Sequence, residues 1–461
     1  MNLPTELLRS LQGVNGFDEE AFVKVHQSGE QVTSIRVNPF KVSNAKSETS
    51  DINSFRVSRF TSHEKIPWTE YGYYLPSRPS FTFDPLFHAG CYYVQEASSM
   101  FLEQALKQTV DLKQPLKVLD LCAAPGGKST HILSLISKES LLVSNEVIRS
   151  RANILVDNIV KWGRSNILVT NNDPRDFKRL QNYFDVIVVD APCSGSGLFR
   201  RDPEAIDEWS EQNVALCCQR QQRILADVVP ALKNGGVLIY STCSYSRQED
   251  EDIAGWLISD LKVKSQKLKV KSDWGVNETG ESYRFWPDKV KGEGFFIACF
   301  RKKDGNDEET YLPKVKQEKF SNLEMEILIK NVNTDGISFL RNREILHAVP
   351  EKLIADIILL SSRLRIVDYG TKIGEIIKEK LIPDHALALS AIVSDRTPRI
   401  ELDYEQAIQY LKKKELNLQA GKKGWNLVAY DGQPLGWINI LSNRINNYYP
   451  KELRILKDFN T

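Results

Sequence analysis

The sequence lacks the cysteine patterns that mark several large classes of protein. Its 461 residues contain only seven cysteines, without the closely spaced framework of disulfide-rich secreted domains. Cysteine pairs separated by two to four residues, which commonly form zinc sites, do not occur, so no metal site is predicted. An odd number of scattered cysteines predicts a reducing compartment, and we expect a cytoplasmic protein.

Long apolar runs and an excess of charge are also missing. No apolar stretch has the length of a membrane span, and MNLPTELLRS at the N-terminus does not resemble a secretion leader, so no membrane association is expected. The formal net charge is only +1, so any surface that binds a polyanion must be local. With 41% hydrophobic and 26% charged residues, the chain is typical of a soluble protein with several domains.

The glycine-rich segment CAAPGGKST lacks the first glycine of a phosphate-binding loop. The pattern G-x-x-x-x-G-K-[ST] would place glycine where Cys122 stands. The dinucleotide pattern G-x-G-x-x-G is absent as well. These absences disfavour a nucleoside triphosphatase, which remains a rival interpretation, and leave an ordinary strand–turn–helix connection as the alternative.

What the sequence does contain, from about residue 117 to 302, is an alternation of short apolar strands and helices. VLDL, LLVSNE, NILVTNND, FDVIVVD and VLIYST have strand patterns, and helical spacing separates them. GEGFFIACFRK (residues 292–302) is predicted to be a last strand near the sheet edge. The pattern predicts an α/β domain with a doubly wound, Rossmann-like sheet, whose site lies at the carboxyl ends of the strands.

Acidic residues stand at the ends of successive predicted strands. Asp120 lies in the first strand, Glu146 ends the second and Asp173 ends the third, while Gly126 and Gly127 open the first helix. A methyl donor such as S-adenosylmethionine has no phosphates and needs a glycine turn for its aminoacyl part and an acid for its ribose hydroxyls. The sequence therefore favours this cofactor over a nucleotide.

Two cysteines also follow buried strands. Cys193 lies in DAPCSG and Cys243 in STCS, and Asp190 precedes the first of them. A thiolate that adds to carbon 6 of cytosine makes carbon 5 nucleophilic, and a second group helps to release the product. Lys128 is a candidate for lowering a thiol pKa. The residues alone do not say which cysteine is the nucleophile, and a lone cysteine is more often a small buried hydrophobe.

The combination of LDLCAAPGGKS, DAPCSGSG and STCSYS resembles the Sun/NSUN RNA cytosine-C(5) methyltransferases. TSIRVNPFK, YYVQEASSM, FRRDPE and GEGFFIA are similar to further motifs of that family. The tail YDGQPLGWINILSNRINNYYPKELRI resembles the PUA-like module of RsmF-like (YebU-like) bacterial 16S rRNA methyltransferases. The resemblance implies a class I methyltransferase fold with an N-terminal RNA-binding extension and a C-terminal PUA-like α+β module.

The resemblance also implies roles for individual residues. It implies that Cys243 is the nucleophile, that Cys193 assists release, and that Asp190 and Lys128 belong to the catalytic site. The residues implied to bind S-adenosylmethionine are Cys122, Ala123, Ala124, Pro125, Gly126, Gly127, Lys128, Glu146, Asp173 and Asp190. The expected divisions are an N-terminal region (1–110), a catalytic domain (111–303), a linker with a first C-terminal subdomain (304–390) and a PUA-like domain (391–461).

RNA, with the small ribosomal subunit favoured, is the expected partner of a monomeric enzyme. Aromatic and basic side chains are the types that bind splayed bases and phosphates. The candidates are Phe199, Arg200, Arg201, Lys422, Lys423, Arg444 and Tyr448. Two alternatives stay open: the same reaction on tRNA, and a non-catalytic RNA-binding factor in ribosome assembly.

Overall fold

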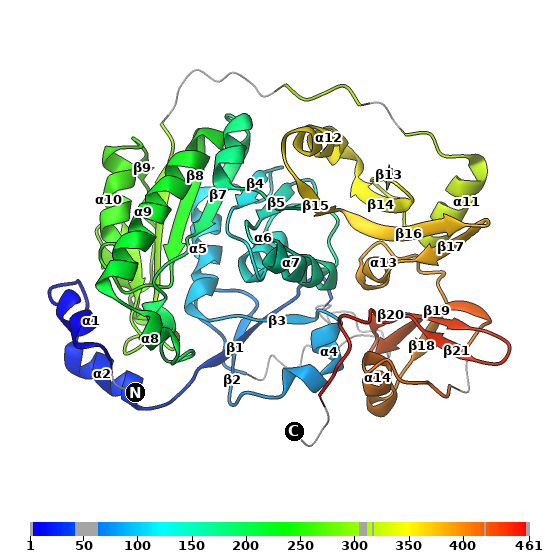
Figure 1. The fold of residues 1–461 in the computed structure, drawn as a ribbon, viewed down its shortest axis with the longest axis horizontal. Coiled ribbons are helices and arrows are strands. Elements are labelled where there is room, and N and C mark those ends of the chain that lie inside the picture. Colours follow the sequence, from blue (N-terminus) through cyan, green and yellow to red (C-terminus); the bar gives the residue numbers. More distant parts are fainter. Residues whose placement is uncertain (1–2, 42–62, 304–310, 316–317, 419–420, 458–461) are drawn as a thin grey trace.

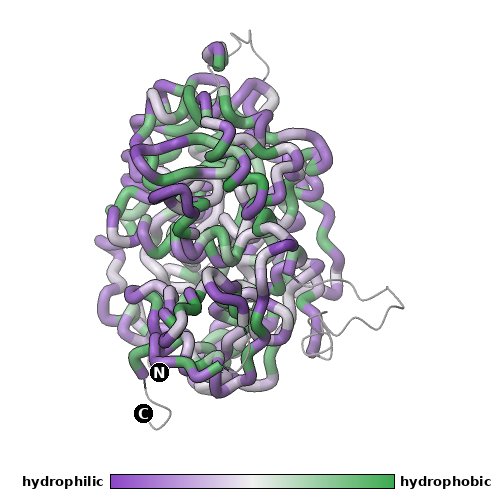
Figure 2. The backbone as a smooth tube through the Cα atoms, turned by 90° about the vertical axis from the view of Figure 1, so that its right-hand side faces the viewer, coloured by the Kyte–Doolittle hydropathy of each residue, from purple (hydrophilic) through white to green (hydrophobic). Residues whose placement is uncertain are grey.

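The computed structural model describes residues 3–41, 63–303, 311–315, 318–418 and 421–457. A large mixed sheet with its helices forms one half of the molecule, and two smaller sheets of the C-terminal region form the other (Figure 1). Residues 304–310, where the predicted linker begins, lie outside the described residues. Hydrophobic and hydrophilic stretches alternate along the whole chain rather than forming one apolar belt (Figure 2). Among the described residues, no helix is long and apolar enough to cross a membrane.

The central sheet has ten strands with a parallel middle. In order across the sheet they are β10 (Asn277–Thr279), β11 (Ser282–Phe285), β12 (Phe295–Arg301), β8 (Leu232–Thr242), β7 (Phe184–Asp190), β4 (Lys117–Asp120), β5 (Leu141–Asn145), β6 (Ile167–Thr170) and β15 (Ile366–Tyr369), with β9 (Lys264–Ser265) paired to β12. The five strands β8, β7, β4, β5 and β6 run parallel, and the pairs outside them are antiparallel. This is the predicted class I methyltransferase sheet. The strand order changes direction at β4, with β5 and β6 following on one side and β7 and β8 on the other.

Helices cover both faces of this sheet because the middle strands are apolar on both sides. On one face lie α5 (Leu102–Thr109), α6 (Gly127–Leu135) and α7 (Arg149–Trp162), which share a core with alternate residues of β4, β5 and β7. On the other lie α9 (Glu211–Val228), α10 (Glu251–Ser259) and α12 (Ile354–Arg363). The doubly wound arrangement therefore follows from the uninterrupted apolar strands seen in the sequence.

Two features of the sheet differ from the sequence-based expectation. The segment 292–302 forms β12, but β12 is not near the edge, because β11 and β10 pair beyond it. Strand β15, from the region predicted as a separate subdomain, pairs antiparallel with β6 and closes the opposite edge. A strand contributed from residues 366–369 leaves no signal in the local pattern around β6, since pairing partners distant in sequence are invisible to periodicity.

The N-terminal region forms helices and a small antiparallel sheet that packs against the catalytic half. Its elements are α1 (Thr5–Ser10), α2 (Glu19–Gln27), β1 (Thr33–Val37), β2 (Gly72–Leu75), α4 (Pro85–His88) and β3 (Tyr92–Val94), with sheet order β2-β1-β3. From β1, the buried guanidinium of Arg36 donates to Thr130 Oγ1 at 2.6 Å and to Gly127 O at 3.2 Å. The N-terminal region is thus tied to the first turn of α6.

The C-terminal region contains two four-stranded sheets. The first has the order β13 (Ile337–Asn342), β14 (Ile345–Pro350), β16 (Thr371–Ile377) and β17 (Lys380–Pro383), flanked by α11 (Asn322–Asn331) and α13 (His385–Leu389). The second has the order β18 (Arg399–Glu401), β19 (Gly424–Tyr430), β20 (Gln433–Ile440) and β21 (Ile445–Asn447), with α14 (Tyr404–Leu411) beside it. The predicted turn at Asp431 and Gly432 joins β19 to β20, and both residues have positive φ. Such a two-residue turn matches strand twist.

Candidate active site

The turn between β4 and α6 requires glycine and is held in place by α7. Gly126 has φ 117°, and a Cβ there would lie 3.2 Å from the side chain of Leu155 in α7. Arg151 and Asn158, also from α7, donate to the backbone oxygens of Ala124 and Pro125, at 2.9 and 2.8 Å. Glycine at this position therefore relieves both a backbone and a packing constraint, and α7 fixes the turn.

Asp120, at the end of β4, has one carboxylate oxygen without a protein partner. Ser129 Oγ donates to Oδ2 at 2.6 Å, whereas the buried Oδ1 accepts no hydrogen bond. Burial raises the pKa of this carboxyl to about 7. An unpartnered buried oxygen beside the glycine turn fits a ligand that brings its own donor, such as the amino group of a methyl donor.

Glu146 follows β5 directly, and two exposed apolar residues come next. The Glu146 carboxylate accepts from Ile148 N at 2.9 Å and lies 3.6 Å from an Arg151 nitrogen. Val147 is 57% exposed and Ile148 is 48% exposed. A carboxylate beside bare apolar side chains suits a ligand with ribose hydroxyls and an aromatic base. The residues of this edge therefore fit S-adenosylmethionine.

Asp173 lies farther from the end of its strand than the sequence suggested. It lies three residues beyond β6 and caps the 3₁₀ helix at Pro174–Arg179, where its side chain accepts from Arg175 N at 3.1 Å. Arg175 Nε lies 3.7 Å from the same carboxylate. Asp173 therefore has a local structural role, and its second oxygen is the part that a cofactor would use.

The two predicted cysteines meet at the same edge of the sheet. Cys193 follows β7 and Cys243 follows the adjacent β8, and their sulfur atoms lie 3.1 Å apart. The contact with Cys243, together with burial, raises the pKa of the Cys193 thiol well above its ordinary value. Burial likewise raises the pKa of Cys122. Both shifts favour the protonated form of these two thiols, and the fold brings the thiols of the DAPCSG and STCS motifs together at one edge of the sheet.

Lys128 and Asp190 form an ion pair beside the cysteines. Lys128 Nζ lies 2.7 Å from Asp190 Oδ2, and Ser241 Oγ donates to Asp190 Oδ1 at 2.8 Å. Burial alone would lower the pKa of Lys128, but the charge and hydrogen bond of Asp190 raise it, and Cys243 adds to this effect. The ammonium also lies 5.3 Å from the centre of the Phe295 ring. The pair places a fixed positive charge within electrostatic reach of Cys243.

Sequence reasoning did not assign roles to Phe295 and Glu249. Phe295 belongs to the GEGFFIA motif, but only the fold brings its ring next to Lys128. Glu249 stands in the acidic run QEDED, which is typical of a solvated surface, yet its side chain is fully buried. A clue in the sequence was the serine that directly follows each cysteine, Ser194 and Ser244.

Two of the predicted RNA-contacting residues are inaccessible. Phe199 is fully buried against α1, α2 and Trp286, so it is a core residue and the predicted base stacking is wrong for this structure. Arg200 is 7% exposed and donates to Glu30 O and Gly292 O, at 2.7 and 3.1 Å, so it joins segments of the protein. The sequence suggested RNA contacts because an aromatic and two basic residues come just past the Cys193 loop, and these are the residue types that bind bases and phosphates. Arg201 is exposed, as predicted.

The basic residues of the tail gather at one end of the second C-terminal sheet. Lys422 and Lys423 directly precede β19, and Arg444 lies in the turn between β20 and β21. The register pairs Gly424 with Ile440 and Ile440 with Ile445, so these three exposed side chains come from adjoining segments. Tyr448 is 43% exposed and packs edge-on against Trp425. The structure therefore brings the four predicted residues of the tail to one surface.

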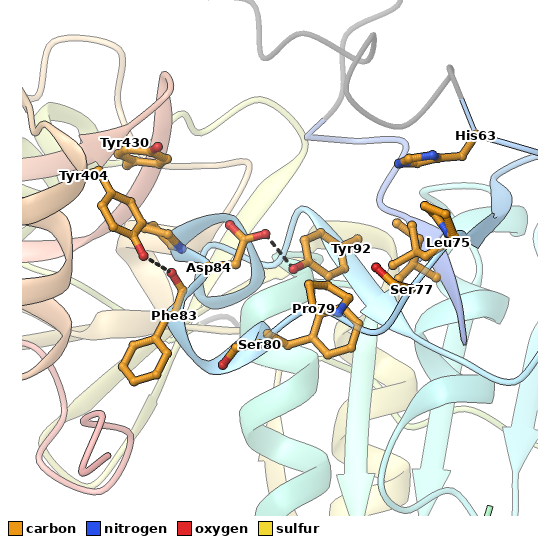
Figure 3. Close-up of a pocket in the computed structure, with 14 residues that line it drawn as sticks. His63, Leu75, Ser77, Pro79, Ser80, Phe83, Asp84, Tyr92, Tyr404 and Tyr430 are labelled. Atoms are coloured by element: carbon orange, nitrogen blue, oxygen red, sulfur yellow. Dashed lines mark hydrogen bonds between the residues drawn. The ribbon is translucent and has the colours of Figure 1, made fainter. Parts of the chain in front are cut away.

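A cavity of about 870 Å³ lies between the N-terminal region and the C-terminal module (Figure 3). Tyr404 and Tyr430 line it from one side, and Tyr404 donates to Phe83 O at 3.1 Å. Tyr92 donates to Asp84 at 2.8 Å on the other side. Its lining does not include the cysteines or the glycine turn, so it is separate from the candidate active site.

Three family models match successive regions of the chain. Residues 107–301 match the family model of 16S rRNA methyltransferase RsmB/F, residues 397–455 the methyltransferase RsmF PUA domain, and residues 3–97 the N-terminal domain of 16S rRNA methyltransferase RsmF. The structure of NSun6 from Pyrococcus horikoshii with SFG has a TM-score of 0.54 at 21% identity, covering 66% of this chain and 99% of that one. A methyltransferase homolog protein from Pyrococcus horikoshii has a TM-score of 0.51 at 26% identity, covering 65% of this chain and all of that one.

Curated relatives extend the similarity over nearly the whole chain. The ribosomal RNA small subunit methyltransferase F of Shewanella woodyi is 32% identical over 440 residues, which cover 91% of this chain and 90% of that protein. The protein of the same name from Vibrio campbellii is 32% identical over 453 residues, covering 91% of each chain. On these grounds the chain belongs to the RsmB/F family of 16S rRNA methyltransferases, on its RsmF branch.

Proposed function

We propose that this protein transfers a methyl group from S-adenosylmethionine to carbon 5 of a cytosine in 16S rRNA. The relatives are named for methylation of small-subunit ribosomal RNA, which supports the substrate class. The observation that carries the choice of cytosine carbon 5 is the pair of cysteine sulfurs 3.1 Å apart beside Lys128 and Asp190. Methylation of a nitrogen or an oxygen would need no such thiol pair.

The residues of the strand ends support binding of S-adenosylmethionine. The turn Cys122–Ala123–Ala124–Pro125–Gly126–Gly127 would approach the aminoacyl part, and Asp120 Oδ1 offers an unpartnered acceptor. Glu146 would accept from the ribose hydroxyls, and Asp173 would lie at the base edge. When bound, the cofactor supplies an electrophilic sulfonium methyl group.

In the proposed mechanism Cys243 is the nucleophile. Its thiolate adds to carbon 6 of the target cytosine, so a carbon–sulfur bond forms and carbon 5 gains the electron density that methyl transfer requires. Lys128 favours the negative sulfur electrostatically, and the Lys128–Asp190 pair orients the base. After methylation a base removes the carbon 5 proton, and its electron pair restores the double bond between carbons 5 and 6. The bond between carbon 6 and Cys243 breaks, and the leaving sulfur takes a proton from the Cys193 thiol.

Cys193 is placed to assist this release. Its thiol lies 3.1 Å from the sulfur of Cys243, a distance at which a proton passes directly between the two groups. The raised pKa of Cys193 keeps it protonated, so it does not compete as a nucleophile. The assignment of Cys243 to attack and Cys193 to release follows the resemblance of the STCS and DAPCSG motifs to the Sun/NSUN family, and the short distance between the sulfurs supports it.

RNA is proposed to reach the site along two surfaces. Arg201 is exposed and follows the Cys193 loop in the sequence. Lys422, Lys423, Arg444 and Tyr448 form the surface at the end of the C-terminal sheet. Exposed cations neutralise phosphates, and an exposed tyrosine stacks on bases. The divisions at residues 110, 303 and 390 also remain proposals, since β15 joins the catalytic sheet from beyond residue 303.

Cellular setting and assembly are part of the same proposal. All seven cysteines are free, which supports a reducing, cytoplasmic compartment for an enzyme that depends on two thiols. The three regions pack into one molecule whose active site is built from a single chain, which supports a monomer.

A direct test combines the purified protein with methyl-labelled S-adenosylmethionine and separate pools of tRNA, naked ribosomal RNA and assembled small subunits. The labelled nucleoside is then identified by mass after digestion. Label in 5-methylcytosine of ribosomal RNA is expected. Label in tRNA would show that tRNA, and not ribosomal RNA, is the substrate. Label on another base would contradict the two-cysteine mechanism. Cofactor binding without label in any pool would support a role as an assembly factor.

A further inference from the structure

The two cysteines lie on separate loops, so something must fix the distance between their sulfurs. Strands β7 and β8 are paired only up to Asp190 and Ser241, and both cysteines lie beyond that last pair. Beyond this pair, one backbone hydrogen bond joins the two loops, from Gly197 N to Cys243 O at 2.8 Å, and it lies four residues past Cys193. A side chain that contacts both loops directly beside the thiols would add to this link and fix the position of Cys193 itself.

Glu249 makes contact with both loops. Its carboxylate accepts from Ser194 N at 2.8 Å, from Ser194 Oγ at 2.5 Å and from Ser244 Oγ at 2.6 Å. Ser194 directly follows Cys193, and Ser244 directly follows Cys243. One carboxylate thus joins the residues next to the two thiols.

The Glu249 carboxylate is itself fixed in place. Gln221 of α9 donates to Oε1 at 3.2 Å and to Pro192 O at 3.1 Å, and Tyr240 of β8 donates to the backbone oxygen of Glu249 at 2.6 Å. Each carboxylate oxygen therefore accepts two hydrogen bonds, and the side chain is fully buried. An ionised carboxylate accepts all four, whereas an amide offers only one acceptor oxygen.

Glu249 also acts electrostatically on the thiol of Cys193. The contact with Cys243 and burial are the largest causes of the raised pKa of Cys193, and the charge of Glu249 adds to them. Lys128, in contrast, interacts electrostatically with Cys243. A negative group held next to the Cys193 loop keeps that thiol protonated. The same side chain that contacts both loops therefore also favours the protonated form of Cys193.

We propose that Glu249 is a positioning residue, which sets the separation of the Cys193 and Cys243 sulfurs by bridging Ser194 and Ser244. It does not touch substrate or cofactor and acts only through the two loops. The inference rests on the proposed function for its catalytic consequence, but the sulfur separation can be tested without RNA.

The experiment compares the full-length wild type with Glu249→Gln, and with Ser244→Ala as a milder variant. Ser244→Ala removes the hydroxyl that donates to Glu249 and accepts from Ser246 N, but it removes no charge. Glu103→Gln is the matched control, because Glu103 is equally buried and accepts from Thr69 Oγ1 and Glu70 N, away from the cysteines. Thermal unfolding and S-adenosylmethionine binding establish that each variant is folded.

The first readout is the rate at which diamide joins Cys193 to Cys243, measured by peptide mapping. Both thiols lose their hydrogens to diamide, which becomes a hydrazide, and a sulfur–sulfur bond forms. Because this bond requires a narrow geometry, Glu249→Gln is expected to slow it about tenfold, with a smaller effect for Ser244→Ala and none for Glu103→Gln. An unchanged rate in folded Glu249→Gln, or equal slowing in Glu103→Gln, would overturn the proposal.

The second readout is turnover on the RNA pool that the wild type methylates. Glu249→Gln is expected to lower kcat about 100-fold, the scale of a misplacement of about 1 Å, with KM values little changed. A rise in KM alone would contradict a positioning role. A wild type inactive on every pool would sink the proposed function, while the diamide rates would still decide the role of Glu249.

Discussion

The carboxyl edge of the central sheet and the end of the C-terminal sheet are built in opposite ways. At the sheet edge, Lys128, Asp190 and the two cysteines are partners of one another, and Glu249 is fully buried. At the end of β19–β21, by contrast, Lys422, Lys423 and Arg444 are exposed. Fixed partners suit groups that must react in one geometry, whereas exposed cations suit a polyanion held by many weak contacts.

The comparison predicts that single changes at the sheet edge act on chemistry and are large. We expect Cys243→Ala to lower methyl transfer by about 10⁴-fold or more, because the covalent step is lost. The measurement is incorporation of labelled methyl groups under single turnover. Cys299→Ala, which alters a buried cysteine of β12 outside the site, is the control and should retain turnover. Activity in Cys243→Ala would remove this cysteine from the mechanism.

The second thiol is expected to behave differently from the first. Cys193→Ala should accumulate an RNA–protein adduct that survives denaturing electrophoresis, because carbon 6 remains bonded to Cys243 when release stalls. Turnover should fall by about 10²- to 10⁴-fold, the range for loss of an acid or base. The adduct should disappear in Cys193→Ala/Cys243→Ala. If it forms in Cys243→Ala instead, the roles of the two thiols are exchanged.

A substitution in the Lys128–Asp190 ion pair tests how much the fixed positive charge contributes to catalysis, compared with the two thiols. Lys128→Met removes the cation beside Cys243 and leaves Asp190 without its partner, so kcat is expected to fall about 10²- to 10³-fold. Its pH–rate profile should shift to higher pH, since the cation no longer favours the thiolate. Lys138→Met, on the surface after α6, serves as the control. An unchanged profile would show that Lys128 does not act on the thiol.

Asp120 allows a test of the buried edge without RNA. Its carboxyl has a pKa of about 7 in the folded protein against an ordinary 3.8, so the unfolded chain releases this proton first as pH rises. Stability is therefore lost progressively from about pH 4 to pH 7. Asp120→Asn should gain about 3 kcal/mol relative to the wild type between pH 5 and pH 8, measured by urea unfolding. A constant difference would contradict the raised pKa.

The smallest effects are expected at the C-terminal surface. Lys423→Gln or Arg444→Gln should weaken RNA binding about tenfold or less and reduce its salt dependence by about one counterion each, without changing kcat. Filter binding at several salt concentrations measures both quantities. Lys380→Gln, an exposed lysine of β17 in the other C-terminal sheet, is the control. A fall in kcat for Arg444→Gln would break the division between the two regions.

Local patterns predicted the central strands, the helices between them and the Asp431–Gly432 turn, because apolar periodicity and turn chemistry are local properties. They misplaced Phe199, since burial depends on α1 and α2, which lie far away in the sequence. They also missed β15, which joins the sheet from beyond residue 303. Long-range packing explains each of these differences.

The sequence by itself determined the order of strands and helices, the glycine turn and the placing of two cysteines and several acids after strands. Parallel strands end at one edge, so these residues had to be neighbours. Only the tertiary structure decided the 3.1 Å contact of the sulfurs, the burial of Glu249 between their loops and the unpartnered oxygen of Asp120. Such distances arise from packing between segments far apart in the chain, which no local pattern encodes.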